Sequence, residues 1–283
     1  MAYDYQLIQT RVDSGVLFAT IDAPPINVMT LELFGELGAF TEEVQDDGEI
    51  RVVVIQSANA DFFIAHFDVE ALLDIPIEEP AVREQDLNEF HKMCERLRTM
   101  PKATIAKIAG RVGGGGSELA SSCDMRFGAL GLAKINQMEV ALGILPGGTG
   151  TQRLPRLLGR GRALELILGS DDLDAETAER WGYLNRALPP AELDDFVDRL
   201  AQRIASFPAE AVALAKESVN NSELPISEGL REEAYLFQKS LRTAGAQRNM
   251  KRFMARGGQT RHEELRIGEL ALDLAKSIRT RSP

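Results

Sequence analysis

Hydrophobic positions along residues 16–110 alternate between short continuous runs and helical spacing. The runs at 16–21, 51–56 and 104–109 are mostly apolar and rich in β-branched residues, which predicts buried strands. Between the runs, apolar residues recur every three or four positions and predict a helix capped by Thr30 and another over about 82–97. Strand, helix and strand in this order predict a parallel α/β arrangement. The residues expected to face inward are Leu31, Phe34, Leu37, Phe40 and Val44 in the first helix, and Leu87, Phe90, Met93, Cys94 and Leu97 in the second.

After Pro146 the spacing is helical with little interruption. Helices are expected at 151–158, 161–168, 175–181, 191–207, 209–220 and 226–242. Pro208 follows a long amphipathic stretch, which favours a boundary at about 205–208. The chain is therefore expected to have two parts, an α/β core over residues 1–205 and a helical region over residues 206–283.

Composition and charge exclude several classes of protein. The 283 residues are 44% hydrophobic and 27% charged, which is typical of a globular protein. With 43 acidic and 32 basic side chains the net charge is -11, which argues against a nucleic-acid partner and against binding to an anionic membrane surface. The N-terminus does not resemble a signal peptide, and no apolar run is long enough to span a membrane. We therefore expect a cytoplasmic protein.

The charge is unevenly distributed. Residues 247–283 hold nine basic and four acidic side chains, so this tail carries +5 and the remainder carries -16. Either the tail is a solvated helical face, or it supplies cationic groups to an anionic ligand.

Cysteine and histidine are too few for a metal site or a disulfide framework. Cys94 and Cys123 are the two cysteines, and His66, His91 and His262 are the three histidines. Their positions match no CxxC or HxxxH spacing, so we expect no metal site.

Four consecutive glycines, Gly113, Gly114, Gly115 and Gly116, follow the predicted strand at 104–109. Glycine is costly to order, so such a run indicates close approach of a ligand to the backbone amides. A helix expected to begin at Ser117 would direct free N–H groups at that ligand. The phosphate motifs GK[ST] and GxGxxG are not met, which leaves a phosphate or a developing enolate oxygen as the anion.

Two glutamates accompany the glycine run. Glu118 lies three residues after Gly115, where it either complements a helix N-terminus or reaches the same cavity. Glu139 lies in an apolar stretch that ends at Pro146 and a second glycine-rich turn. A carboxylic acid in such surroundings tends to have a raised pKa and can donate a proton, whereas on an open turn it would be merely solvated. Two carboxylates beside an amide-lined pocket are the parts needed for proton transfer next to a thioester carbonyl.

Three segments resemble the crotonase (enoyl-CoA hydratase/isomerase) superfamily, and the resemblance extends over about residues 12–240. Residues 108–120, with Cys123 and Asp124, resemble its glycine-rich oxyanion segment. Residues 143–154 are similar to the segment after its second glutamate, and residues 175–182 match its characteristic helix.

The resemblance implies a spiral of ββα units followed by a C-terminal helical region, residues 206–283, that forms trimers or dimers of trimers. It implies an acyl-CoA substrate whose thioester oxygen meets the backbone amides of Phe67 and Gly115, with Glu118 and Glu139 as catalytic groups. No separate cofactor is implied, since coenzyme A is part of the substrate. The further substrate-binding positions implied are Ala65, His66, Asp68, Gly114, Leu142 and Gly147. The pocket floor is expected around residues 70–100 and 137–145.

The chain departs from the superfamily pattern at three places. His66 replaces the glycine of the first oxyanion segment, so the Phe67 amide is either displaced or undisturbed. Glu70 stands where many relatives carry a lysine near the CoA phosphates, and the chain from about Ala244 is longer than the usual ending. The basic tail is the candidate for the missing positive charge.

The leading hypothesis is an enoyl-CoA hydratase that adds water to a trans-2-enoyl thioester and gives the 3-hydroxyacyl-CoA. A Δ3,Δ2-enoyl-CoA isomerase, or another enolate reaction of the superfamily, is the first alternative because isomerases commonly manage with the glutamate at the Glu139 position. A non-catalytic acyl-CoA-binding or assembly protein is the second.

Overall fold

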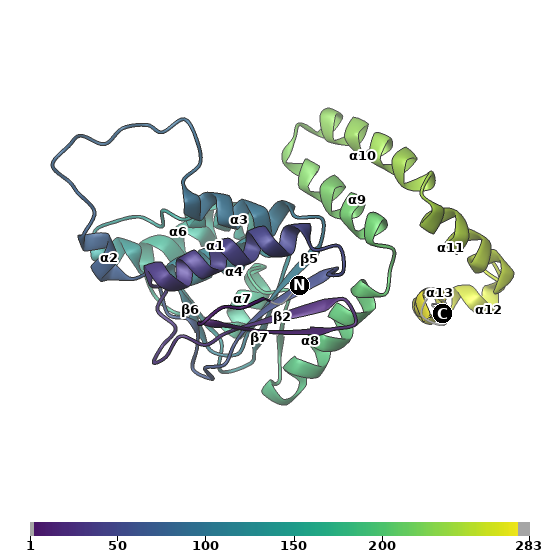
Figure 1. Ribbon diagram of the computed structural model, residues 1–283, viewed down its shortest axis with the longest axis horizontal. Helices are drawn as coiled ribbons and strands as arrows, with labels where there is room; N and C mark the ends of the chain where they lie inside the picture. The colour runs from purple at the N-terminus through teal and green to yellow at the C-terminus, as the bar shows by residue number, and fades with distance from the viewer. Residues whose placement is uncertain (1–2, 277–283) are drawn as a thin grey trace.

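The computed structural model describes residues 3–276 and contains two β-sheets surrounded by helices (Figure 1). The larger sheet has six strands in the order β1-β2-β3-β5-β7-β10, and the smaller has four in the order β4-β6-β8-β9. The strands are β1 Ile8–Asp13, β2 Val16–Ile21, β3 Val52–Ser57, β4 Phe62–Ile64, β5 Ala103–Ile108, β6 Arg111–Gly113, β7 Met125–Ala129, β8 Lys134–Asn136, β9 Leu173–Asp174 and β10 Arg186–Leu188.

The chain winds between the two sheets in a repeating order. Strands β3, β5 and β7 belong to the large sheet, and each is followed by a strand of the small sheet, β4, β6 or β8, and then by helical structure. Neighbouring strands within each of these two sets are parallel, whereas β1 pairs antiparallel with β2. This is the spiral of ββα units that the resemblance implied. Strand β1 was not predicted.

Helices cover both faces of the large sheet. The core helices are α1 Leu31–Asp46, α2 Val69–Leu73, α3 Glu89–Thr99, α4 Gly114–Ser122, the 3-10 helix η1 Glu139–Leu142, α5 Gly150–Leu158, α6 Arg160–Gly169, α7 Ala175–Trp181 and α8 Pro190–Ala205. Helix α8 packs on β2, β3, β5 and β7 and encloses one hydrophobic cluster. The larger cluster lies on the other face, between the sheets and helices α1 and α3 to α7.

The C-terminal helices form an arm that extends beside the core (Figure 1). They are α9 Ala209–Asn220, the 3-10 helix η2 Asn221–Glu223, α10 Ile226–Leu241, α11 Ala244–Ala255, α12 Arg261–Glu264 and α13 Ile267–Lys276. Lys216 of α9 joins the arm to the core, because its Nζ lies 2.9 Å from Asp124 Oδ2 and donates to the carbonyls of Leu97 and Lys102. None of the helices described over residues 3–276 is long and apolar enough to cross a membrane.

The predicted helix over 82–97 was wrong at its start. Helix α3 begins at Glu89, because the Asn88 side chain caps it by accepting a hydrogen bond from His91 N at 2.8 Å. Val82 and Leu87 are 79% and 52% exposed, so the preceding segment has no buried face to stabilise a helix. Met93, Cys94 and Leu97 are buried as expected, and Phe90 is partly buried.

Two further helices differ from expectation in detail. Thr30 caps α1 as predicted, but Leu31 is 64% exposed and Leu33 takes its place in the core. Helix α4 begins at Gly114 rather than at Ser117, so three of the four glycines form its first turn. Glycine is needed within this turn because α4 packs closely on β4: a Cβ on Gly116 would lie 2.6 Å from the Ile64 Cβ.

Candidate active site

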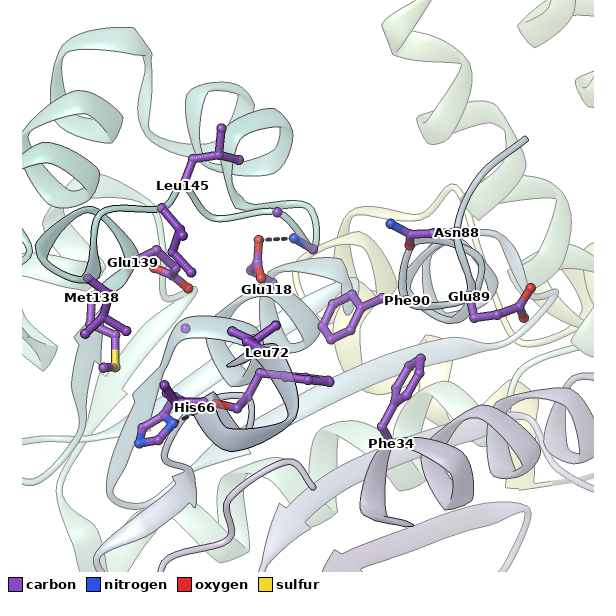
Figure 2. A pocket seen from close by; sticks show the side chains of 18 residues that line it. Phe34, His66, Leu72, Asn88, Glu89, Phe90, Glu118, Met138, Glu139 and Leu145 are labelled. Atoms are coloured by element: carbon purple, nitrogen blue, oxygen red, sulfur yellow. Dashed lines mark hydrogen bonds between the residues drawn. The ribbon is translucent and has the colours of Figure 1, made fainter. Parts of the chain in front are cut away.

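A cavity of about 400 Å³ lies at the N-terminal end of α4 (Figure 2). Its lining comes from five regions that are distant in the sequence: the start of α1, the segment after β4 with α2, the start of α3, the start of α4, and residues 138–148. The lining residues are Phe34, His66, Phe67, Val69, Leu72, Asn88, Glu89, Phe90, Gly114, Gly115, Glu118, Met138, Glu139, Leu142, Ile144, Leu145, Gly147 and Gly148.

The backbones of Phe67 and Gly115 meet at the cavity wall. A Cβ built on Gly115 would lie 3.3 Å from the Phe67 Cβ, so only glycine leaves the two segments this close without adjustment. Gly115 is in the first turn of α4, where N–H groups have no partner within the helix. The Phe67 N–H donates no hydrogen bond within residues 3–276. The wall therefore offers two amide donors to a ligand oxygen.

The backbone conformation at position 66 does not require glycine, so His66 is accommodated in this wall. Its φ is not in the left-handed region, and the segment is fixed to Met29 by Met29 N–His66 O at 2.9 Å and Asp68 N–Met29 O at 3.0 Å. Gly114 makes the room instead: its φ is +47°, and a Cβ there would lie 3.2 Å from the His66 Cβ. The His66 Nδ1 lies 2.8 Å from the Phe67 carbonyl oxygen, and Figure 2 shows the ring directed away from Glu118.

Glu118 is pinned by the start of α5. Its side chain accepts three backbone hydrogen bonds at a single oxygen, Oε1, from Gly148 N at 2.8 Å and from Thr149 N and Gly150 N at 2.7 Å each. Glu118 is only 4% exposed, so these donors replace water around the carboxylate. Oε2 takes part in none of these bonds and is free to accept a proton or a water.

Glu139 is held by fewer contacts and is 8% exposed. It opens the 3-10 helix η1, and its carboxylate accepts from Gln137 Nε2 at 3.1 Å and 3.3 Å. Burial raises the pKa of Glu139, and the nearby charge of Glu118 raises it further, while hydrogen bonds from its own backbone and from Gln137 oppose the rise. Glu139 is thus not the solvated residue that an open turn would give.

Aromatic rings form the wall opposite Glu139. Phe34, Phe67 and Phe90 come from α1, from the segment after β4 and from α3, with ring centroids 5.7–6.1 Å apart. In Figure 2 Phe90 and Glu139 lie on opposite sides of Glu118. The site therefore has an apolar end and an acidic centre.

The structure brings most of the predicted site residues to this one cavity. Glu118, Glu139, Phe67, Gly115, His66, Gly114, Leu142 and Gly147 all line it. Ala65 and Asp68 do not; Ala65 is buried beside Gly113, and Asp68 caps α2 by accepting from Glu70 N.

Phe90 and Gln137 fall within the ranges expected for the pocket floor, 70–100 and 137–145, although neither was singled out as a site residue. Sequence reasoning missed Phe34, which it placed only in the core, and the amides of residues 148–150. The second glycine-rich turn, followed by a helix, was the signal that could have revealed those amide donors.

The basic tail, the two cysteines and the three histidines were also considered as ligand-binding groups in the sequence. The cavity lining includes none of the tail residues 247–275, and Arg279 and Arg281 lie outside the described residues. Cys94 and Cys123 are free and buried. Within residues 3–276, no three His, Cys, Asp or Glu side chains are grouped so that they could hold a metal ion.

Comparisons with known proteins agree with this architecture. The family model described as enoyl-CoA hydratase/isomerase matches residues 11–262. The crotonyl-CoA hydratase of Syntrophomonas wolfei is 32% identical over 260 residues, covering 90% of this chain and 96% of that protein. The short-chain-enoyl-CoA hydratase of Clostridium acetobutylicum is 33% identical over 213 residues, covering 74% and 78%.

A solved structure extends the likeness to three dimensions. The crystal structure of an enoyl-CoA hydratase from Bacillus anthracis has a TM-score of 0.80 and 27% identity, covering 89% of this chain and 97% of that one. By sequence and by fold, the chain belongs to the enoyl-CoA hydratase/isomerase family, with the crotonase fold.

Proposed function

We propose that the protein is an enoyl-CoA hydratase, which adds water across the C2=C3 bond of a trans-2-enoyl-CoA. The observation that carries the proposal is that two carboxylates, Glu118 and Glu139, face one cavity beside two free backbone amides. Relatives at 32–33% identity bear the names of enoyl- and crotonyl-CoA hydratases, which supports an acyl-CoA thioester as the substrate.

In the proposed mechanism the amides of Phe67 and Gly115 hold the thioester oxygen and stabilise the charge that develops there as water attacks. Glu118, with Oε1 fixed by three N–H groups, uses Oε2 to orient a water and take its proton, and the hydroxide oxygen bonds to C3. Glu139 gives its proton to C2, so the C2=C3 π bond is replaced by C3–O and C2–H bonds.

The raised pKa of Glu139 suits the role of a proton donor, because it keeps the carboxyl protonated to a higher pH than an ordinary glutamate. Hydration involves no net oxidation or reduction, so the proposal requires no redox group. The two carboxylates and two amides supply the proton transfer and the charge stabilisation that the proposed steps need.

The test is loss of the enoyl absorbance of crotonyl-CoA by the purified protein, with the product identified as 3-hydroxybutyryl-CoA. Glu118→Gln and Glu139→Gln are each expected to lower kcat/KM by about 10²–10⁴, because each removes one proton-transfer group. An isomerase would instead convert 3-enoyl-CoA, keep much of its activity in Glu118→Gln and lose it in Glu139→Gln. CoA-thioester binding without turnover on any enoyl-CoA would support the non-catalytic alternative and contradict the hydratase.

The helical region over residues 206–283 is our candidate for subunit assembly into a trimer or a dimer of trimers, with residues 1–205 as the acyl-CoA-binding core. Support comes from large apolar side chains that are exposed on α10, among them Ile226, Leu230, Tyr235 and Phe237. Light scattering should give three or six times the 31.1 kDa chain mass, and a monomer at micromolar concentration would contradict the assembly. The cytoplasmic location remains a prediction.

A further inference from the structure

We propose that Phe90 is a specificity-determining residue, which closes the acyl end of the cavity and restricts the enzyme to short acyl chains of about four carbons. The inference rests on the proposed function, because that function fixes where the thioester lies. The inference adds to that function the class of substrate, short-chain enoyl-CoA thioesters.

The direction of the acyl chain follows from the groups that act on it. The thioester oxygen lies at the amides of Phe67 and Gly115, C2 must be within reach of Glu139, and C3 must be within reach of the water on Glu118 Oε2. The carbons beyond C3 therefore continue past the Glu118 carboxylate.

The space beside that carboxylate is filled by the far edge of the Phe90 ring. A Cβ built on Gly148 would lie 2.4 Å from Glu118 Oε2 and 2.5 Å from Phe90 Cε1. The edge of the ring and the free carboxylate oxygen therefore lie next to each other beside Gly148. A Cβ on Gly115 would lie 3.5 Å from both Cε2 and Cζ of Phe90. The ring thus spans from Gly115 to Gly148, across the path that C4 and later carbons would take.

Packing holds the ring in this position. It is stacked on Phe34 at 5.7 Å with an interplanar angle of 21°, and Phe67 meets it edge-on at 6.1 Å. The start of α3 is fixed by the Asn88 cap, and three residues of the same helix, Met93, Cys94 and Leu97, are buried in the core. A longer acyl chain would have to displace a ring supported by two others.

Position 90 can be tested with three thioesters of increasing length, crotonyl-CoA, trans-2-octenoyl-CoA and trans-2-dodecenoyl-CoA. We expect the wild type to prefer crotonyl-CoA over octenoyl-CoA in kcat/KM by at least about tenfold. Phe90→Ala should lower that preference by about ten- to a hundredfold, mainly through faster turnover of the longer substrates, and Phe90→Leu should have a smaller effect in the same direction. Thr99→Ala, an exposed change at the opposite end of the same helix from the cavity, should keep the wild-type preference.

A wild type that prefers octenoyl-CoA, or an unchanged preference in both folded Phe90 variants, would overturn the inference. Calorimetry with butyryl-CoA and octanoyl-CoA gives a readout that is independent of turnover: Phe90→Ala should gain affinity for octanoyl-CoA relative to butyryl-CoA. If the wild type hydrates none of the three substrates, the proposed function fails. The two affinities then still decide whether Phe90 limits chain length.

Discussion

Glu118 and Glu139 face the same cavity but differ in what holds them. Glu118 has one oxygen fixed by three backbone N–H groups at the start of α5, whereas Glu139 has one side-chain partner, Gln137, and surroundings that raise its pKa. The first arrangement fixes a carboxylate in one orientation. The second disfavours ionisation and favours a proton on the carboxyl.

In the proposed mechanism this difference prepares two chemically identical side chains for opposite halves of a proton transfer. Amides at the start of α5 fix the position of Glu118, and burial raises the pKa of Glu139. Changes that affect position should therefore act through Glu118, and changes that affect proton affinity should act through Glu139.

Apart from replacing either glutamate, the largest effect is expected from Gly148→Ala. The new Cβ would lie 2.4 Å from Glu118 Oε2, and the carboxylate cannot yield easily because three N–H groups hold its other oxygen. We expect kcat/KM for crotonyl-CoA to fall by about 10²-fold, which is typical of a misplaced catalytic group. Gly161→Ala, where a Cβ has no neighbour within 4 Å, is the matched control and should keep wild-type kinetics. Equal activity in the two variants would show that Glu118 is not rigidly positioned.

An intermediate effect is expected in stability, with opposite signs for the two glutamates. Glu118→Gln replaces hydrogen bonds to a charged oxygen with neutral ones and should lower the unfolding free energy by about 1–3 kcal/mol. Glu139 has a raised pKa in the fold, so its ionised form destabilises the protein above that pKa and costs nothing below the unfolded pKa. Glu139→Gln should therefore be more stable than the wild type at pH 8, with the gain shrinking as the pH falls towards 4. Urea unfolding at the two pH values measures both; shifts of the same sign at pH 8 would contradict the comparison.

The smallest effect is expected at Gln137. Its amide donates to the Glu139 carboxylate and so favours the ionised form, which opposes the rise in pKa. Gln137→Met removes the donor at similar volume, and the pKa of Glu139 should rise further. Glu139 then stays protonated to higher pH, so the alkaline limb of the pH profile of kcat/KM should move up by about half to one pH unit. Gln56→Met, the same change at a partly buried amide that donates to Thr20, should leave the alkaline limb in place. A downward move of the limb in Gln137→Met would assign it to another group.

The parts of the fold that depend on local sequence were predicted well. The strand at 16–21, the Thr30 cap and the helices at 175–181 and 209–220 have the bounds that apolar spacing and capping residues indicated. The start of α3 was wrong because Val82 and Leu87 have helical spacing but nothing buries them.

The candidate site likewise combines features that local sequence predicts with features that only the tertiary fold creates. The two glutamates and the glycine run could be recognised from their own segments. The amides that fix Glu118 lie 30 to 32 residues away from it, and Phe34 and Phe90 reach the cavity from two other helices. Spacing within one segment cannot show contacts that only the tertiary fold creates.

Helix α3 connects two parts of the molecule, because one of its ends lines the cavity and the other contacts the C-terminal arm. Phe90 stands at its first end, in the cavity wall. At the other end the carbonyls of Leu97 and Arg98 accept hydrogen bonds from Lys216 and Asn220 of the C-terminal arm. The helix has 11 residues, a rigid rod of about 16 Å. The C-terminal arm and the ring that we propose to limit acyl-chain length are therefore attached to opposite ends of one rigid element.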